Sequence, residues 1–275
     1  MPPIINTNSA SLNAQRHLGI NQSETQTPLQ RLSSGKRINS AKDDAAGLAI
    51  AARFATQILG SSQAIRNTSD GVSLAQTAEG GLQEVSSNIQ RLRELAVQSS
   101  NGTLSASDRQ SLQGEFQTIQ AEINRVTQGT EFNGVQVLGS AQNLDFQVGS
   151  NAGDTITANT VDVANDAAIN PALTTADIST EANASAALSA LDAALSRTAE
   201  IRSDFGTLQN RFESTIRSTE TTNENLAAAR SRIEDADYAQ ETANLTRSLI
   251  LQQASIATLG QANINQQHTL SLLGG

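Results

Sequence analysis

The chain has 275 residues, a formal net charge of −9 and an aromatic content of 3%, with no Trp, one Tyr and six Phe. This length is enough for one or two domains with a core, and the acidic charge argues against a nucleic-acid-binding protein, which would carry a basic face. The absence of Cys excludes a disulfide framework, a thiolate metal site and a Cys nucleophile. With so few aromatic rings, narrow helix–helix contacts filled by Leu, Ile, Val and Ala are easier to build than a wide globular core.

The N-terminal stretch, MPPIINTNSASLN, has neither the basic start nor the apolar h-region of a Sec-type signal peptide. No apolar run in the chain reaches the roughly 18–20 residues that span a bilayer. We therefore expect no membrane partner, and a route other than Sec if the protein leaves the cell.

A weak helical seam, meaning a stripe of residues at alternating spacings of three and four that faces a partner helix, begins near the N-terminus. It contains Leu18, Leu29 and Leu32, but Ser, Gln and Thr occupy most positions between them. So polar a seam buries too little apolar surface to hold a lone helix in water.

The stretch LSSGKRINSAKDDAAGLAIA, residues 32–51, joins a basic turn that contains Gly to an Ala-rich helix. We interpret Gly35 to Asn39 as a joint. Ser40, followed by Asp43 and Asp44, predicts a new helix N-terminus, where acidic side chains stabilise the positive end of the helix dipole. The Ala-rich face that follows would let neighbouring backbones approach closely.

Three longer seams indicate long helices. The first contains Ala75, Ala78, Leu82, Val85, Ile89, Leu92 and Ala96, the second Leu112, Phe116, Ile119, Ile123 and Val126, and the third Ile201, Phe205, Leu208, Phe212, Thr215, Thr219, Thr222, Leu226, Ala229 and Ile233. Seams of this length are typical of coiled coils and helical bundles.

Turn signals separate these seams. Asn101-Gly102 predicts the end of one helix, and Ser107 with Gln110 three residues later predicts a capping box at the start of the next.

Two further signals predict short strands in the middle of the chain. Asn133-Gly134 is typical of a tight β-hairpin turn. The weak alternation from Leu144 to Val163 predicts one or two short hairpins there.

The C-terminal end resembles the N-terminal one. Residues 248–275 contain no Asp, Glu, Lys or Arg, yet the 4–3 spacing continues. The seam residues are Leu245, Leu249, Gln252, Ile256, Leu259, Asn263, Gln266, Leu270 and Leu273. We expect the two ends to order only when they pair with each other and with copies of the chain. The expected packing residues, within the core and between subunits, are Leu29, Leu32, Leu245, Leu249, Ile256, Leu259, Leu270 and Leu273.

The sequence thus predicts a mainly α fold, with long antiparallel helical rods forming a coiled-coil bundle and a small β-hairpin region in the middle of the chain. Residues 1–42 and 235–275 are expected to form a terminal coiled-coil domain that is disordered in the monomer. Residues 43–234 are expected to form a helical bundle domain with β-hairpins at about 131–180.

Candidate chemical sites are weak. His17 and His268 have no second His and no Cys at metal-ligand spacing. The pair Asp43-Asp44 is better explained as a helix cap than as an acid–base pair. No phosphate-binding GK[ST] and no zinc-peptidase HExxH occur. We predict no enzyme activity, no catalytic residue, no cofactor and no metal.

Four long stretches resemble bacterial flagellin: LSSGKRINSAKDDAAGLAIA, NIQRLRELAVQSSNGTLS, EINRVTQGTEFNGVQVL and ETANLTRSLILQQASIATLGQANINQQHTLSLLGG. The resemblance covers about residues 4–140 and 185–275, and these motifs are far more specific than any short pattern. The chain departs from many flagellins in the middle, where about 40–45 residues replace large variable outer domains.

The resemblance implies a short flagellin with an inner terminal coiled coil (D0-like) and a helical bundle with a β-hairpin (D1-like). It implies a secreted, extracellular structural subunit that polymerises into the bacterial flagellar filament for motility. Such a subunit is exported unfolded by the flagellar type III apparatus and folds on assembly. Its implied partners are copies of itself, a flagellar export chaperone, the filament cap and hook-junction proteins. A hook–filament junction protein of the same family is the alternative, and an enzyme is a remote third hypothesis.

The resemblance also implies a surface for the host's flagellin-sensing Toll-like receptor. The residues that match it are Arg91, Leu95 and Glu115. Without a receptor, Arg91 and Glu115 would be ordinary solvated helix charges, and Leu95 would pack between subunits.

Overall fold

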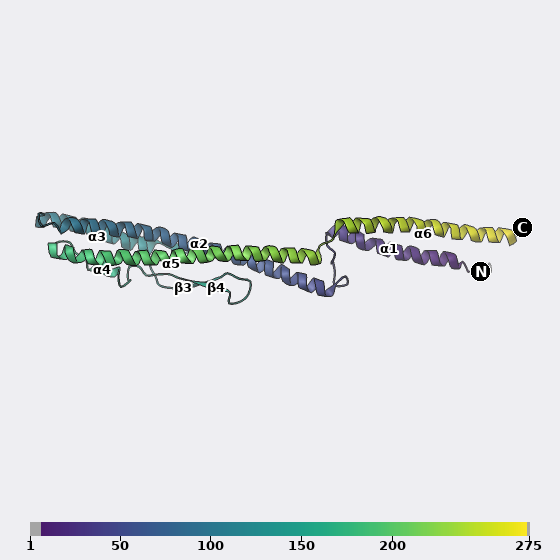
Figure 1. The fold of residues 1–275 in the computed structure, drawn as a ribbon, viewed down its shortest axis with the longest axis horizontal. Coiled ribbons are helices and arrows are strands. Elements are labelled where there is room, and N and C mark those ends of the chain that lie inside the picture. The colour runs from purple at the N-terminus through teal and green to yellow at the C-terminus, as the bar shows by residue number, and fades with distance from the viewer. Residues whose placement is uncertain (1–6, 274–275) are drawn as a thin grey trace. The chain divides into compact units, whose positions relative to one another are not determined.

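The computed structural model describes residues 7–273, except for the side chains of Thr269, Leu270, Leu272 and Leu273. The elements in chain order are α1 (Ser9–Ser34), α2 (Ala45–Ser99), α3 (Ala106–Gly129), β1 (Glu131–Phe132), β2 (Val135–Gln136), β3 (Asn143–Gln147), β4 (Thr155–Asn159), α4 (Asn170–Thr174), α5 (Glu181–Glu234) and α6 (Tyr238–Leu273) (Figure 1). Long helices that pack against one another confirm the predicted mainly α class.

The chain divides into two compact units. The terminal unit comprises Met1–Thr56 and Asn225–Gly275, and the central unit comprises Gln57–Glu224. The expected domain limits, after residues 42 and 234, follow the breaks between helices, whereas the compact units also assign the start of α2 and the end of α5 to the terminal unit.

The core of the central unit is a long apolar stripe. Every residue of the first predicted seam, from Ala75 to Ala96, is buried, which confirms that seam. The helices α3 and α5 add the large buried side chains Phe116, Ile123, Ile201, Phe205, Leu208 and Phe212. The stripe ends at Phe212, because Thr side chains follow it in the third seam and are half-buried or exposed.

Two antiparallel hairpins lie in the middle of the chain. Between β1 and β2, Asn133 and Gly134 have φ values of 50° and 78°, as the predicted Asn-Gly turn requires. Strands β3 and β4 form the second hairpin, with Ile156 and Ala158 buried. The strands end at Asn159, and the rest of the expected hairpin region contains turns and the short helix α4.

Two buried glutamines of α3 hold the segment around α4 through its backbone. Gln113 Oε1 accepts a hydrogen bond of 2.7 Å from the Ile178 N–H. Gln120 Nε2 donates one of 2.8 Å to the Ala172 carbonyl. Each bond pairs a polar atom of a buried side-chain amide with a backbone group of this segment, so neither of the two atoms is left without a hydrogen-bond partner.

The capping box of α3 lies two residues before the predicted one. The Asp108 N–H donates to the Ser105 hydroxyl at 3.2 Å, and the Ser105 N–H donates to the Asp108 carboxylate at 3.1 Å. The predicted pair of Ser107 and Gln110 was therefore wrong. Both pairs have the required spacing, but a carboxylate is the stronger acceptor next to free N–H groups.

A glycine of α2 lets one aromatic ring connect three elements of the central unit. A Cβ at Gly71 would come within 2.7 Å of the Phe212 ring on α5. Phe212 in turn meets Phe146 of β3 edge to face, with ring centroids 5.4 Å apart. The missing side chain at Gly71 thus allows the ring to pack directly against α2.

We expect Gly71→Ala to lower the free energy of unfolding by about 1–3 kcal/mol, because the added methyl group overpacks against Phe212. Gly80→Ala in the same helix is the control: no atom lies within 4 Å of its added Cβ. That change should raise stability by about 0.4–1 kcal/mol through the unfolded chain. Urea denaturation followed by circular dichroism measures both, and equal effects of the two substitutions would contradict the packing argument.

The capping box should weaken in acid, below the usual titration range of Asp. Hydrogen bonds from the Ser105 hydroxyl first, and then from its N–H, lower the pKa of Asp108. The contribution of the Asp108 carboxylate to stability is therefore complete above the unfolded pKa of about 3.9 and is lost as the pH falls through the lower folded pKa. An NMR titration should show this midpoint, and Ser105→Ala should raise it. An unshifted midpoint in the parent would refute the cap's role.

Candidate functional site

The terminal unit contains the helix pair α1 and α6 and has almost no apolar core. Helices α1 and α6 pack along each other (Figure 1). Among the described residues of this unit, the buried apolar side chains are Ala14, Pro28, Ile38 and Ala51. All four are small or isolated, so the pair removes little apolar surface from water.

The seam between α1 and α6 has the predicted spacing of three and four residues. About half of its positions are the predicted residues, and the other half are shifted by one residue. The positions that agree are Ser11, Leu18, Thr25 and Leu32 on α1, and Leu245, Gln252, Leu259 and Gln266 on α6. The alternate positions fall one residue earlier, at Ala14, Asn21 and Pro28 on α1, and at Ser248, Ser255 and Ala262 on α6. Small side chains therefore occupy much of the line where the two helices meet.

The packing residues expected from the sequence divide into three groups. Those half-buried in this seam are Leu32, Leu245 and Leu259. Those beside it, with 44–56% of their surface exposed, are Leu29, Leu249 and Ile256. The side chains of Leu270 and Leu273 lie outside the described part of the structure. Among the described side chains, those of the first group contribute most to the helix pair within one chain.

Exposed large apolar side chains belong mainly to the terminal unit. In the described part of the central unit they are Leu59 and Val97. In the described part of the terminal unit they are Leu12, Ile20, Leu29, Ile50, Tyr238, Leu249, Ile250, Leu251, Ile256 and Ile264. Apolar side chains gathered in this way mark a surface for contact with another macromolecule.

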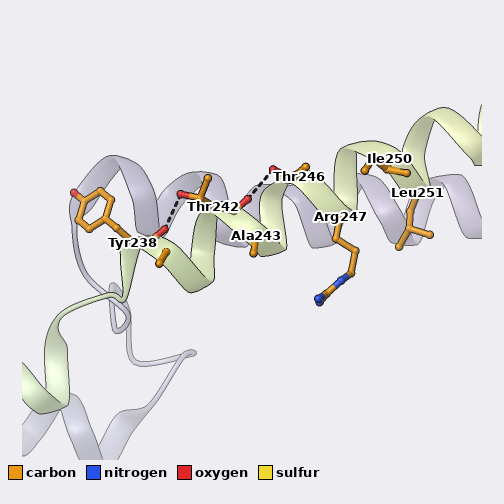
Figure 2. Close-up of a pocket in the computed structure, with 8 residues that line it drawn as sticks. Tyr238, Thr242, Ala243, Thr246, Arg247, Ile250 and Leu251 are labelled. Atoms are coloured by element: carbon orange, nitrogen blue, oxygen red, sulfur yellow. Dashed lines mark hydrogen bonds between the residues drawn. The ribbon is translucent and has the colours of Figure 1, made fainter.

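Several of these side chains gather at the start of α6. Tyr238, Ile250 and Leu251 line an open hollow of about 900 Å³ along its first turns (Figure 2). Thr242 and Thr246 lie between them, and their hydroxyls donate to carbonyls of the same helix at 2.6 and 2.9 Å. Because those hydroxyls are satisfied internally, the threonines do not oppose an apolar contact here.

A joint ties the end of α1 to the start of α6. Gly35, whose φ of 72° favours glycine, ends α1, and its carbonyl accepts the Ala236 N–H at 3.0 Å. The Arg37 N–H donates to the Glu234 carbonyl at 2.7 Å. These bonds connect the non-helical segment after α1 with the one between α5 and α6, so the two segments form one structural feature.

Helix α2 begins at Ala45, not at Ser40 as predicted. Asp44 is its cap, with Oδ1 accepting a backbone N–H of the first turn at 2.8 Å. Asp43 Oδ2 instead accepts the N–H groups of Asn39 and Ser40, and the Ser40 hydroxyl. These bonds, that from the Ser40 N–H above all, lower the pKa of Asp43. The two acids therefore have different structural roles, one in the helix and one in the joint.

The residues expected to contact a receptor lie on the central unit. Arg91 Nη2 on α2 forms an ion pair of 2.7 Å with Glu115 Oε1 on α3, and both side chains are about half exposed. Glu115, and after it Glu94, raise the pKa of Arg91. Leu95, expected on the same surface, is fully buried in the core. It can influence this surface only by holding α2 in place.

The candidate chemical residues remain apart. His17 and His268 are both exposed, and no group of three or more acidic, His or Cys side chains within the described residues could hold a metal ion. In the same part of the chain, no helix has the length and apolar character needed to cross a membrane.

A long helical fold, a weakly cored helix pair and exposed apolar side chains along that pair are the features of a structural subunit that packs against copies of itself. Residues 5–143 match the bacterial flagellin N-terminal helical region, and residues 188–273 match the bacterial flagellin C-terminal helical region. The chain therefore belongs to the bacterial flagellin family, whose members are structural subunits of the flagellar filament and not enzymes.

Curated relatives align over nearly the whole chain. The flagellin of Halalkalibacterium halodurans is 47% identical over 271 residues, which cover 98% of this chain and 99% of the relative. The flagellin of Bacillus subtilis is 40% identical over 305 residues, covering 98% and 99%. The flagellar filament 30.7 kDa core protein of Treponema maltophilum is 38% identical, with the same coverage. A short form without a large variable domain is consistent with these alignments.

Solved structures agree with this assignment. A crystal structure of Bacillus cereus flagellin is 30% identical, with a TM-score of 0.52 over 60% of this chain and 94% of that one. A putative flagellar hook-associated protein from Vibrio parahaemolyticus has a TM-score of 0.60 but only 13% identity, over 70% of this chain and 100% of that one, and therefore shows the fold alone. The full-length flagellin relatives support the filament subunit and do not favour the junction-protein alternative.

Proposed function

We propose that the terminal unit of this filament subunit joins copies of the chain, and that α1 and α6 become stably ordered as they do so. The observation that carries the proposal is the uneven distribution of apolar side chains. The buried ones lie almost entirely in the central unit, whereas most exposed ones lie in the terminal unit.

The energetics of the terminal helices support this coupling. Ordering a residue costs about 1–2 kcal/mol of backbone entropy, and a fully buried Leu or Ile returns about 1.5–3 kcal/mol. In one chain, Leu249, Ile250 and Ile256 return little of this because they remain exposed. Neighbouring copies that cover these side chains would shift the balance towards order.

The geometry of such contacts favours a filament over a closed ring. Different faces of one subunit that fit each other generate head-to-tail contacts, which build an open helical polymer when the rotation does not close. The exposed residues of α1, α6 and the start of α2 provide several distinct faces for this purpose.

The same weakness suits delivery of the subunit. A chain whose ends order only on assembly can be exported unfolded through the flagellar type III apparatus and reach the extracellular filament. On this proposal its partners, besides itself, are a flagellar export chaperone, the filament cap and hook-junction proteins. The exposed apolar face of α6 is the surface that a chaperone would have to cover before assembly.

Brief protease treatment tests the proposal. The monomer should lose residues 1 to about 40 and about 238 to 275 and leave a resistant core from near Asp43 to near Asp237, since the central unit has its own apolar core. The core should be soluble and unable to polymerise, and filaments of the full chain should protect both ends. Mass spectrometry of the fragments and electron microscopy of seeded growth give the readouts.

Two results would contradict it. Ends that resist digestion in the monomer as well as the central unit does would show that assembly is not needed for their order. A trimmed core that still forms filaments would show that the terminal unit does not join the copies.

We also propose that Arg91 and Glu115 form part of a surface for the host's flagellin-sensing Toll-like receptor. Support comes from their position, since both side chains are about half exposed and their ion pair spans neighbouring helices. An exposed ion pair adds little to stability, so these side chains are free to serve recognition. Leu95 is buried and would support this surface from below.

Arg91→Ala should remove most receptor signalling by the monomer in a reporter cell, because the guanidinium and its orientation by Glu115 are both lost. Arg125→Ala is the matched control, since Arg125 forms a similarly exposed ion pair with Glu122 on α3. Signalling that is unchanged by Arg91→Ala, or equally reduced by the control, would rule out this role. Circular dichroism should show that both variants fold.

A further inference from the structure

We infer that the Arg31–Glu241 ion pair fixes the axial register of α1 against α6, and that this register decides whether a subunit fits the filament. The second part rests on the function proposed above. The pair lies in the terminal unit and joins Arg31 Nη1 to Glu241 Oε1 at 2.9 Å.

The rest of the seam does not specify a register. Along α6, the seam positions alternate between Leu and Gln every seven residues, at Leu245, Gln252, Leu259 and Gln266. The positions between them are all small, at Ser248, Ser255 and Ala262. If α6 moves along α1 by seven residues, each small side chain of the seam takes the place of another small one. If it moves by fourteen, each Leu of the seam also takes the place of another Leu. Pairing patterns that repeat in this way permit alternative registers.

The other polar contacts across the seam can be remade after a slip. Asn8 Nδ2 donates to the Ala262 carbonyl at 3.2 Å, but every residue of α6 has a carbonyl. Asn21 Nδ2 donates to the Ser255 hydroxyl at 2.8 Å, and Ser248 would occupy the same place after a slip of seven residues. Neither contact therefore distinguishes the described register from the one that brings Ser248 to Asn21.

Glu241 cannot be replaced in this way, because it is the only acidic residue in the sequence of α6. Its side chain is only 8% exposed, and that of Arg31 is 28% exposed. Arg31 Nε and Glu241 Oε2 are buried and have no hydrogen-bond partner, so neither group has a second ionic contact through these atoms. A slipped register would thus leave a buried carboxylate without its cation, which is strongly unfavourable. Buried polar groups that set the register of paired helices act in this manner.

The register matters because it places exposed residues of one helix relative to those of the other. Each residue of slip moves α6 by about 1.5 Å along its axis. Leu249 and Ile256 would then change their position relative to Ile20 on α1. Since every copy in a helical polymer must present the same surfaces, a slipped subunit would not fit its neighbours.

Engineered disulfides can report the register, because the chain contains no Cys. Asn21→Cys with Ser255→Cys joins residues that contact each other in the described register. Asn21→Cys with Ser248→Cys, or with Ala262→Cys, joins residues that meet only after a slip of seven. Disulfides form efficiently only when the two Cα atoms are within about 7 Å. Oxidation of seeded filaments, followed by mass spectrometry, gives the yield of each link.

In the parent chain, the link to position 255 should form in several-fold excess over the other two. Arg31→Met with Glu241→Met removes the ion pair without leaving a lone buried charge. In this background the three links should form in comparable yields, and seeded growth should slow several-fold. Arg31→Glu with Glu241→Arg should restore the excess at position 255, because opposite charges again meet in one register only.

The exposed ion pair of Arg125 with Glu122 supplies the control. Replacement of both its members by Met should change neither growth nor the link pattern. If the Arg31 and Glu241 double Met variant does not assemble alone, it can be mixed as a minority with the parent chain, and the links in mixed filaments are read in the same way.

A double Met variant that links only through position 255 and grows at the parent rate would overturn the inference. So would a charge exchange that leaves the three links equal. Failure of the proposed function looks different: protease would then reach the ends of the parent chain in its filaments, whatever the ratio of the links.

Discussion

The structure depends on where apolar side chains are buried. In the central unit, Leu82, Ile89 and Phe116 lie in a continuous core that one chain completes by itself. In the terminal unit the same helical spacing carries Ser, Asn, Gln and Ala, so that one chain buries almost no large side chain there. Both units are helical, but only the first has the apolar burial that offsets the entropy of ordering. The central unit thus provides most of the stability of the single chain, and the terminal unit provides most of the exposed apolar surface for contact with other copies.

The seam of α6 has an arrangement opposite to that of an ordinary helix pair. Large apolar side chains usually fill the line where two helices meet. Here Ser248 and Ser255 occupy that line, and Leu249 and Ile256 lie beside it. Small residues in the seam bring the backbones close, while the large ones remain for other contacts. A helix built in this way has more than one partner, and this agrees with a subunit that is surrounded by copies of itself in a filament.

Sequence reasoning succeeded where one interaction dominates. The apolar spacing from Ala75 to Ala96 identified the central core, and Asn133-Gly134 identified a hairpin turn that needs two residues with positive φ. It was less accurate where several residues could do the same task. Either of two Ser-containing pairs could cap α3, and the choice depended on acceptor strength. Along α6, each alternate seam position could be either of two adjacent residues, a large one such as Leu249 or the small one before it, Ser248. The spacing alone could not show that the small residue faces α1. Leu95 was misplaced: the family resemblance put it on an exposed surface, whereas it is buried in the core with Leu92 and Ala96.

A seam made of small and repeating residues has a further consequence. Weak, repetitive contacts allow two helices to pair and separate easily, which suits the ordering on assembly that we propose for these ends, but they discriminate poorly between registers. Discrimination then has to come from a group that occurs once. In α6 that group is Glu241, close in sequence to the joint where the Ala236 N–H donates to the Gly35 carbonyl. An ion pair beside this joint sets the register at the point where α1 ends and α6 begins. Residues 248–273 of α6, which contain no Asp, Glu, Lys or Arg, can then pack against a neighbour without leaving such a charge unpaired.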